Sequence, residues 1–421
     1  DARRKHAEHY IRLLARLGAA ISDGERSALE AIDADFENLR AAWRCAASLG
    51  ASALLARGAV PLMSFCDLRG RLEDGLALMR EAAASPAARD DVALRVLAQA
   101  CASHLEYRLD RYPEALAAAE RAYAAADSAR DVEARVQALK TMAACALRLG
   151  NLEDARRHYQ AALDAKAASV DPNHAAAMLD NLALVEHALG NDDEALALSR
   201  RSLAVHRQLG DDAGIALCLN NLASMLMDRQ DFAQAGACLR EGLAIAERQG
   251  LVATRTLLLV NLAQVAVEAE PDEAAIAAVA RAREAVDASR NRVLACWVHM
   301  VACKLDVRRG DLSGARDGIC RAIALARTVE RPILQRSAVA TFAEILAGQG
   351  EPGAARRVLG FVSAHPATTQ AERAYIAGKL AKLPPGDRDP PWPDVSLDAL
   401  VERIVAEAPD AHAGLVALLR T

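Results

Sequence analysis

Asparagine recurs at a fixed interval in the middle of this chain, at Asn181, Asn221 and Asn261, with 40 residues between neighbours. A side-chain amide carries both a donor and an acceptor, so a row of amides can clamp an extended peptide by pairing with its N–H and C=O groups. The alternative is that each amide bonds a neighbouring helix. We favour this structural interpretation, because the asparagine column is turned by about 100° around the helix from the positions that would face a ligand. Asn220, one residue earlier, is therefore the better ligand contact.

Two other kinds of chemistry are weaker candidates. Cys296, His299 and Cys303 share a helical stretch and offer soft metal ligands, but structural zinc needs a fourth ligand that the sequence does not suggest nearby. No phosphate-binding loop, no G-x-G-x-x-G, no H-E-x-x-H and no G-x-S-x-G is present. We therefore expect no catalytic residue, no metal and no cofactor in this chain.

The elements that position these side chains repeat every 40 residues. One residue ends each apolar helical stretch and precedes the next: Gly70, Asp110, Gly150, Gly190, Gln230, Glu270, Gly310 and Gly350. A small residue follows five positions later: Gly75, Ala115, Ala155, Ala195, Ala235, Ala275, Ala315 and Ala355. We expect this column to mark the closest approach of two helices, and a period of this length is typical of a solenoid of helix pairs.

Composition indicates an all-α protein of modest charge. Hydrophobic residues form 53% of the 421 residues and aromatic residues only 3%, so the core must consist largely of the strong helix formers Ala and Leu. A net charge of −5 gives no reason to expect direct binding to nucleic acid or membrane, and we expect no membrane span. Nine cysteines without a CxxC pair indicate a reduced, cytoplasmic protein. The missing initiating Met suggests a fragment or a processed product.

The pattern predicts three parts. Residues 1–50 form an N-terminal helical cap, residues 51–363 form the repeat array, and residues 364–421 form a C-terminal helical cap with a Pro-rich loop. The final segment, Ser396 to Ala408, is an amphipathic helix with Ser396 as its N-cap. We expect this helix to cover the open end of the array, as terminal units of solenoids must.

The repeat resembles the tetratricopeptide repeat in its columns. It has a large–small pair such as Leu222-Ala223 on the first helix, Gly at the turn, an aromatic residue or Leu two positions later, and Ala on the second helix. HEAT and armadillo repeats are the alternative, and the Gly and Ala columns speak against them. The resemblance implies a right-handed superhelical solenoid of about eight tetratricopeptide-like helix pairs with helical caps at both ends.

The flanks are similar to the C-terminal repeat module of bacterial STAND-class signalling ATPases. The similarity rests on RRKHAEHYIRLL at 3–14, LEAIDADFENLRAAWRCA at 29–46, and TQAER at 369–373 with WPDVSLDALVERIVAEA at 392–408. In that family the module follows a nucleotide-binding switch domain, and an output domain often begins or ends the polypeptide. The resemblance therefore covers the whole chain but only part of the implied protein, and the ATPase is not in these residues.

The resemblance also implies a concave face lined by the first helix of each pair, at positions ten, six and three residues before the turn. These positions and their neighbours give a candidate binding groove: His104, Tyr107, Arg108, Lys140, Arg148, Asp180, His187, Asn220, Ser224, Asp228, Gln264, Lys304 and Arg308. Groups of both signs suit an extended peptide or a segment of the parent protein's own ATPase domain. A merely solvated inner surface is an equally weighted alternative.

These expectations combine into one function with two alternatives. We expect a sensor and interaction module that binds a protein, peptide or small-molecule effector and regulates an attached ATPase and its transcriptional or other signalling output. The first alternative is a passive scaffold or homo-oligomerisation domain. The second is a free-standing peptide-binding receptor.

Overall fold

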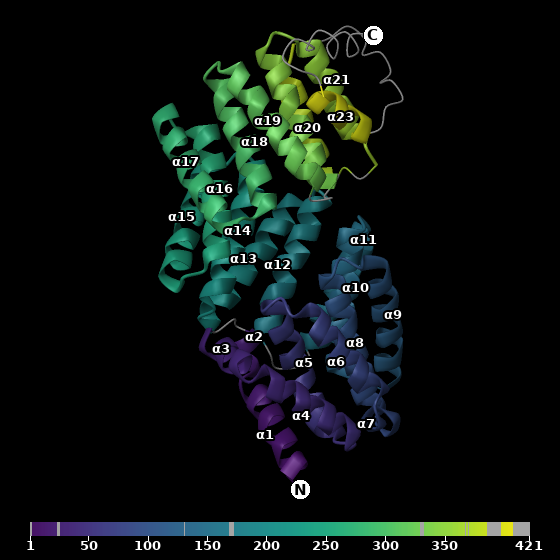
Figure 1. The fold of residues 1–421 in the computed structure, drawn as a ribbon. Coiled ribbons are helices and arrows are strands. Elements are labelled where there is room, and N and C mark those ends of the chain that lie inside the picture. Colours follow the sequence, from purple (N-terminus) through teal and green to yellow (C-terminus); the bar gives the residue numbers. More distant parts are fainter. Residues whose placement is uncertain are drawn as a thin grey trace. The chain divides into compact units, whose positions relative to one another are not determined.

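The fold is known from a computed structural model, which describes residues 2–22, 26–129, 131–167, 172–328, 332–366, 368, 370–384 and 397–406. All regular structure within these ranges is helical and no strand occurs there, so the prediction of an all-α repeat solenoid is confirmed (Figure 1). The predicted right-handed superhelix describes the path of the whole array and stays a prediction.

The chain divides into two compact units, one of residues 1–186 and 197–213 and one of residues 187–196 and 214–421. The helices before this boundary are α1 (Ala2–Arg16), α2 (Gly18–Ser22), α3 (Arg26–Ala34), α4 (Phe36–Ser48), α5 (Ser52–Leu68), α6 (Leu72–Ala84), α7 (Pro86–Asp90), α8 (Val92–Arg108), α9 (Tyr112–Ala129), α10 (Val132–Arg148) and α11 (Leu152–Ala167). The boundary crosses three helices: α12 (Pro172–Ala188), α13 (Asp192–Leu209) and α14 (Asp212–Asp228).

The second unit continues with nine described helices: α15 (Phe232–Gln249), α16 (Val252–Ala269), α17 (Asp272–Ser289), α18 (Arg292–Arg308), α19 (Leu312–Thr328), α20 (Pro332–Gly348), α21 (Pro352–Ala364), α22 (Gln370–Lys382) and α23 (Leu397–Ala406). Eight helix pairs therefore follow one another from α5–α6 to α20–α21, and each pair turns at a residue that the 40-residue spacing identifies. The predicted division at residues 50 and 363 stays a prediction.

Backbone conformation explains the turn residues. Seven of the eight turn positions have positive φ, from 60° at Asp110 to 83° at Gly190, and only glycine adopts this region without penalty. The turn at Glu270 differs, with φ −112° and ψ 162°. Pro271 follows directly, and a residue before proline is pushed into the extended region. The sixth turn thus departs from the repeat for a local steric reason.

The small-residue column packs helix against helix as expected. All seven alanines of this column are 0% exposed. A Cβ placed on Gly75, the eighth member, would lie 2.7 Å from the Cβ of Cys66 on α5, which leaves no room for a larger residue. Interlocking of this closeness is what keeps both units regular.

The predicted N-terminal cap contains four described helices, α1 to α4, and the chain turns at Leu17 and again at Asp35. Its apolar stripe is buried, with Ile11 and Leu14 both 0% exposed. Trp43 is also fully buried and donates its Nε1–H to the Leu78 carbonyl at 3.1 Å, which ties α4 to the first helix pair.

The C-terminal part holds one helix that the sequence did not predict. α22 follows the break at His365-Pro366, where α21 ends. α23 corresponds to the predicted amphipathic helix and packs on α19 and α20 through the buried Leu400 and Val401. The proposed cap Ser396 and the Pro-rich loop at 385–393 lie outside the described residues.

One helix bears on the expectation that the chain has no membrane span. α16 is long and apolar enough to cross a membrane by length and hydropathy alone. It packs between α15, α17 and α18, and 44% of the apolar window is buried. Core helices pass the same test, so this one helix is weak evidence for a membrane span.

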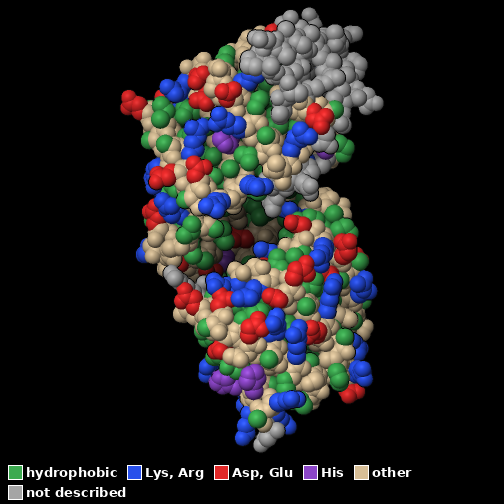
Figure 2. Space-filling model, viewed as in Figure 1, with side chains coloured by type: hydrophobic (Ala, Val, Ile, Leu, Met, Phe, Trp, Pro, Cys, Tyr) green, Lys and Arg blue, Asp and Glu red, His purple; other side chains and the backbone are tan. Residues whose placement is uncertain are grey.

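Figure 2 shows Lys and Arg side chains mixed with Asp and Glu over the visible face of each unit, in line with the small net charge.

Candidate ligand-binding groove

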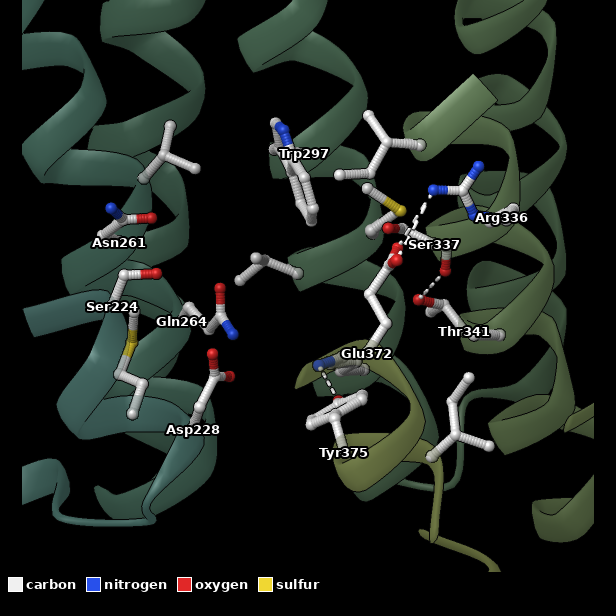
Figure 3. A pocket seen from close by; sticks show the side chains of 18 of the residues that line it. Ser224, Asp228, Asn261, Gln264, Trp297, Arg336, Ser337, Thr341, Glu372 and Tyr375 are labelled. Atoms are coloured by element: carbon white, nitrogen blue, oxygen red, sulfur yellow. Dashed lines mark hydrogen bonds and ion pairs between the residues drawn. The ribbon is translucent and has the colours of Figure 1, made fainter. Parts of the chain in front are cut away.

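A cavity of about 590 Å³ opens within the second unit. Its lining comes from the last residues of α12, from the first helix of each following pair (α14, α16, α18 and α20), from α21 and from α22. The first helices lie side by side, so polar residues at corresponding positions of successive repeats meet at one surface (Figure 3). This is the arrangement that the concave-face prediction requires.

Uncharged polar groups form one wall of the cavity. Asn261 on α16 donates its Nδ2–H to Oδ1 of Asn220 on α14 at 2.8 Å. Ser224 and Gln264 lie beside this pair, and neither side chain has a hydrogen-bond partner among the described residues. The wall therefore offers amide and hydroxyl groups that are ready to pair with a ligand.

The base of the cavity is apolar. Val260, Val301 and Met300 are each at most 2% exposed and line it together with the half-buried Trp297. Trp297 stands between the amide wall and α20 (Figure 3). An apolar base with a few polar groups at the edge is typical of sites for small ligands and short peptides.

Charged residues form the opposite wall. Arg336 on α20 is only 5% exposed, and its Nη2 lies 3.4 and 3.5 Å from the two carboxylate oxygens of Glu372 on α22. The Arg336 Nε is buried and has no hydrogen-bond partner within the described residues. Glu372 points from α22 toward this guanidinium across the cavity from Asn261 and Ser224 (Figure 3).

Lys304 on α18 joins this charged wall. Its Nζ lies 3.4 Å from Oε1 of Glu268 and donates to the Tyr375 hydroxyl at 3.2 Å. Burial lowers the pKa of Lys304, but Tyr375, Glu344 and Glu268 outweigh burial and raise that pKa above its ordinary value. Burial likewise raises the pKa of Glu268, but the Lys304 and Lys379 ammonium groups hold it below its ordinary value. Lys304 and Glu268 are therefore charged at neutral pH.

His187 bridges three helices at one end of the cavity. Its Nδ1 lies 2.9 Å from Asp192 at the start of α13, and its Nε2 lies 2.9 Å from Asp228 at the end of α14. Burial lowers the pKa of His187, but hydrogen bonds to the two carboxylates outweigh burial and raise it. The pair of carboxylates thus favours the imidazolium form.

Seven of the sequence-predicted residues line this cavity: His187, Asn220, Ser224, Asp228, Asn261, Gln264 and Lys304. Arg308 does not, because its guanidinium donates to the carbonyls of Val267 and Glu270 and pairs with Asp272 at 2.7 Å. Asn181 on α12 and Asn221 on α14 are half-buried and make no side-chain hydrogen bond with the described residues. The asparagine column is therefore not uniform, since only Asn261 bonds a neighbouring helix.

The predicted residues of the first unit are held by one another or by the adjacent helix. His104 and Arg108 on α8 both contact Asp67 on α5, at 3.1 Å each. Arg148 on α10 donates to the Tyr112 hydroxyl at 2.8 Å, and the ring of Tyr112 lies tilted against that of Tyr107 with 5.7 Å between centroids. These contacts link successive repeats.

Lys140 and Asp180, also in the first unit, make other contacts. Lys140 donates to Gln137 on its own helix at 3.5 Å. Asp180 is half-buried beside His206, with 3.8 Å between its Oδ2 and the His206 Nε2. Neither residue lines the cavity of about 590 Å³.

The weak metal candidate shows packing contacts. Cys296 and Cys303 are fully buried, and the Cys296 thiol donates to the Ala322 carbonyl at 3.2 Å. Burial raises the pKa of Cys296 to about 12, so this thiol stays protonated at neutral pH. Among the described residues, no group of three or more His, Cys, Asp or Glu side chains is arranged to hold a metal ion.

The groove residues that the sequence did not predict include Trp297, Arg336, Glu372, Tyr375 and Lys379. Arg336 lies fourteen residues before its turn at Gly350. The predicted groove positions lie only ten, six and three residues before a turn, so they do not include it. Glu372, Tyr375 and Lys379 belong to α22, beyond the repeat. Their spacing of three and four residues places them on one helical face, and that spacing was the available signal.

Comparisons with known proteins support the tetratricopeptide-repeat fold. The Tetratricopeptide repeat family matches residues 173–248, which run from α12 to α15. No protein with a curated description matches the sequence.

Several solved structures share the fold. The apo form of the quorum sensor NprR from B. thuringiensis has a TM-score of 0.58 and 14% identity, and the match covers 85% of this chain and 97% of that one. A Rap protein complexed with competence and sporulation factor has a TM-score of 0.52 and 12% identity over 83% and 98% of the two chains. A STAND protein with a tetratricopeptide repeat sensor from Pyrococcus horikoshii has a TM-score of 0.53 and 13% identity, over 74% of this chain and 49% of that one. The chain thus spans about half the length of the STAND protein.

Proposed function

Since the chain is built from tetratricopeptide repeats, we propose that it is a sensor module in the cytoplasm that binds a peptide segment in the groove of its second unit and thereby regulates an attached ATPase. One observation carries this proposal: the amide wall of Asn220, Asn261 and Gln264 faces Arg336 across an apolar base. Peptide backbones need alternating donors and acceptors, and side-chain amides supply both.

The likeness to known proteins supports the same function. A Rap protein was solved with competence and sporulation factor, and NprR is described as a quorum sensor. The Pyrococcus horikoshii protein combines a STAND ATPase with a tetratricopeptide repeat sensor. By analogy, binding regulates the attached ATPase only if the ligand favours one conformational state of the array over another.

Selection from a phage-displayed library of random heptapeptides, followed by calorimetry with the synthetic winners, tests the binding proposal. We expect Asn261→Ala and Gln264→Ala to weaken binding by about tenfold each, because an unpaired amide group of the bound peptide costs about 1–3 kcal/mol. Gln208→Ala is the matched control, since this exposed amide on α13 lies outside the cavity. Peptides that bind all three variants as tightly as the wild type would contradict the proposal.

A free-standing peptide receptor is the second candidate, because the matches to NprR and the Rap protein cover nearly the whole of those chains. Translating the coding DNA upstream of Asp1 separates the two. A phosphate-binding loop within the preceding few hundred residues supports the ATPase sensor. A start codon close to Asp1 supports the receptor instead.

A further inference from the structure

α22 behaves as a helix seated in a recognition groove. Glu372, Tyr375, Ile376 and Lys379 line the cavity, and their spacing of three, four and seven residues places them on one face. Each polar member has a partner on a first helix: Glu372 meets Arg336, Tyr375 meets Lys304, and Lys379 lies 3.1 Å from Glu344. Ile376 is 2% exposed and supplies the apolar contact. Helix-in-groove recognition uses anchors at these intervals.

Both ends of α22 are fixed by α21. Before the helix, Thr368 is buried and its hydroxyl donates to the Val362 carbonyl at 2.6 Å. After it, Arg356 on α21 donates to the carbonyls of Leu383 and Pro384 at 3.0 and 2.7 Å. The helix is therefore tethered beside the groove whether or not its own face is docked.

The docked face is an imperfect fit at Arg336. A guanidinium pairs best with a carboxylate through two parallel N–H donors. Here only Nη2 reaches Glu372, at distances near the upper limit for a hydrogen bond, and the buried Nε lacks a partner among the described residues. A carboxylate that engaged both nitrogens would bind this cation better than Glu372 does. Among the α22 residues whose side chains the structure describes, Ile376 is the one buried apolar residue.

We propose that α22 is a displaceable internal occupant of the groove, and that the partner replacing it is an amphipathic helix of another protein or domain. That helix carries an acidic side chain for Arg336, an aromatic one three residues later for Lys304 and a basic one four residues after that for Glu344. The proposal rests on the proposed function, because it names the kind of segment that the groove receives and the contact that regulates access.

A charge-swapped variant of the full chain, Glu372→Arg with Lys379→Glu, tests this idea without changing the net charge. Ala374→Arg is the control, because Ala374 is exposed on the same helix and does not line the cavity. We expect amide hydrogen exchange to accelerate in residues 370–382 of the swapped variant. Exchange in α16 stays unchanged if the repeats remain folded.

The probe for the second arm is a fluorescent synthetic peptide with the sequence of residues 368–384. We expect it to bind the swapped chain at least about tenfold more tightly than the wild type or the control, because a tethered helix competes at millimolar effective concentration. Equal binding to all three chains, or unchanged exchange in residues 370–382, overturns the proposal. Faster exchange without peptide binding also overturns it, since α22 would then be a structural cap. Neither arm uses the heptapeptides, so a failure here leaves the result for the amide wall intact.

Discussion

The two units share one scaffold and use its inner face differently. In the first unit, the polar residues of the first helices bond to each other, as His104 and Arg108 do to Asp67. In the second unit, Ser224 and Gln264 line a cavity without partners among the described residues, and a separate helix supplies a carboxylate for Arg336 and a hydroxyl for Lys304. The 40-residue repeat therefore determines how the helices pack, whereas the groove depends on residues at positions that the repeat does not constrain.

Overpacking the small-residue column gives the largest expected effect and tests whether the scaffold is the same in both units. Ala155→Leu on α11 and Ala315→Leu on α19 should each lower the free energy of unfolding by about 3 kcal/mol, because both positions are 0% exposed and have no room for a longer side chain. Urea unfolding measures this. The exposed Ala117→Leu and Ala277→Leu are the controls. A loss of stability at only one of the two buried sites would mean that the scaffold differs between the two units.

Turn substitutions are expected to have smaller effects, which differ between two neighbouring turns. Gln230→Gly should raise the free energy of unfolding by about 1 kcal/mol, because Gln230 has a φ of 61° that glycine adopts without strain. Glu270→Gly, the matched substitution at an extended turn residue, should instead be neutral or destabilising by up to about 1 kcal/mol. Thermal unfolding of both variants decides this, and stabilisation by both would refute the conformational explanation.

The two histidines sharpen the comparison through their titration. Burial lowers the pKa of His104, and its bond to Asp67 offsets this only in part because Lys140 and Arg108 are close. The pKa of His187 is raised by its two carboxylates despite burial. NMR titration should therefore find that His187 protonates at a higher pH than His104. A common midpoint would remove this contrast between the units.

The same shifts predict opposite effects on stability. His187 binds its proton more tightly when folded, so its contribution is fully present below the ordinary pKa of about 6.5 and is lost as pH rises through the folded value. His104 binds its proton less tightly when folded, so stability falls as pH drops below about 6.5. The difference in free energy of unfolding between the wild type and His187→Asn should therefore grow as pH falls through this range. The corresponding difference for His104→Asn should shrink.

The 40-residue period predicted the scaffold, because helix packing restricts the residue types at each repeated position. Gly150 and Ala155 were identifiable from spacing alone, since a left-handed turn and a close helix contact tolerate few residue types. Asn220 and Gln264 followed from the same spacing. Arg336 did not, because its role depends on α22, a helix outside the repeat whose docking is a tertiary event. The turn at Glu270 has the expected position in the sequence, but its extended conformation required the structure.

The unit boundary crosses α12, α13 and α14, so it does not coincide with any gap between helices. A recombinant fragment that begins at Gly214 would retain Asp228 but lose His187 and Asp192, together with the turn that carries them. A recombinant fragment should therefore contain whole helix pairs and begin before α12. The 76 residues that match the repeat family begin at the same place.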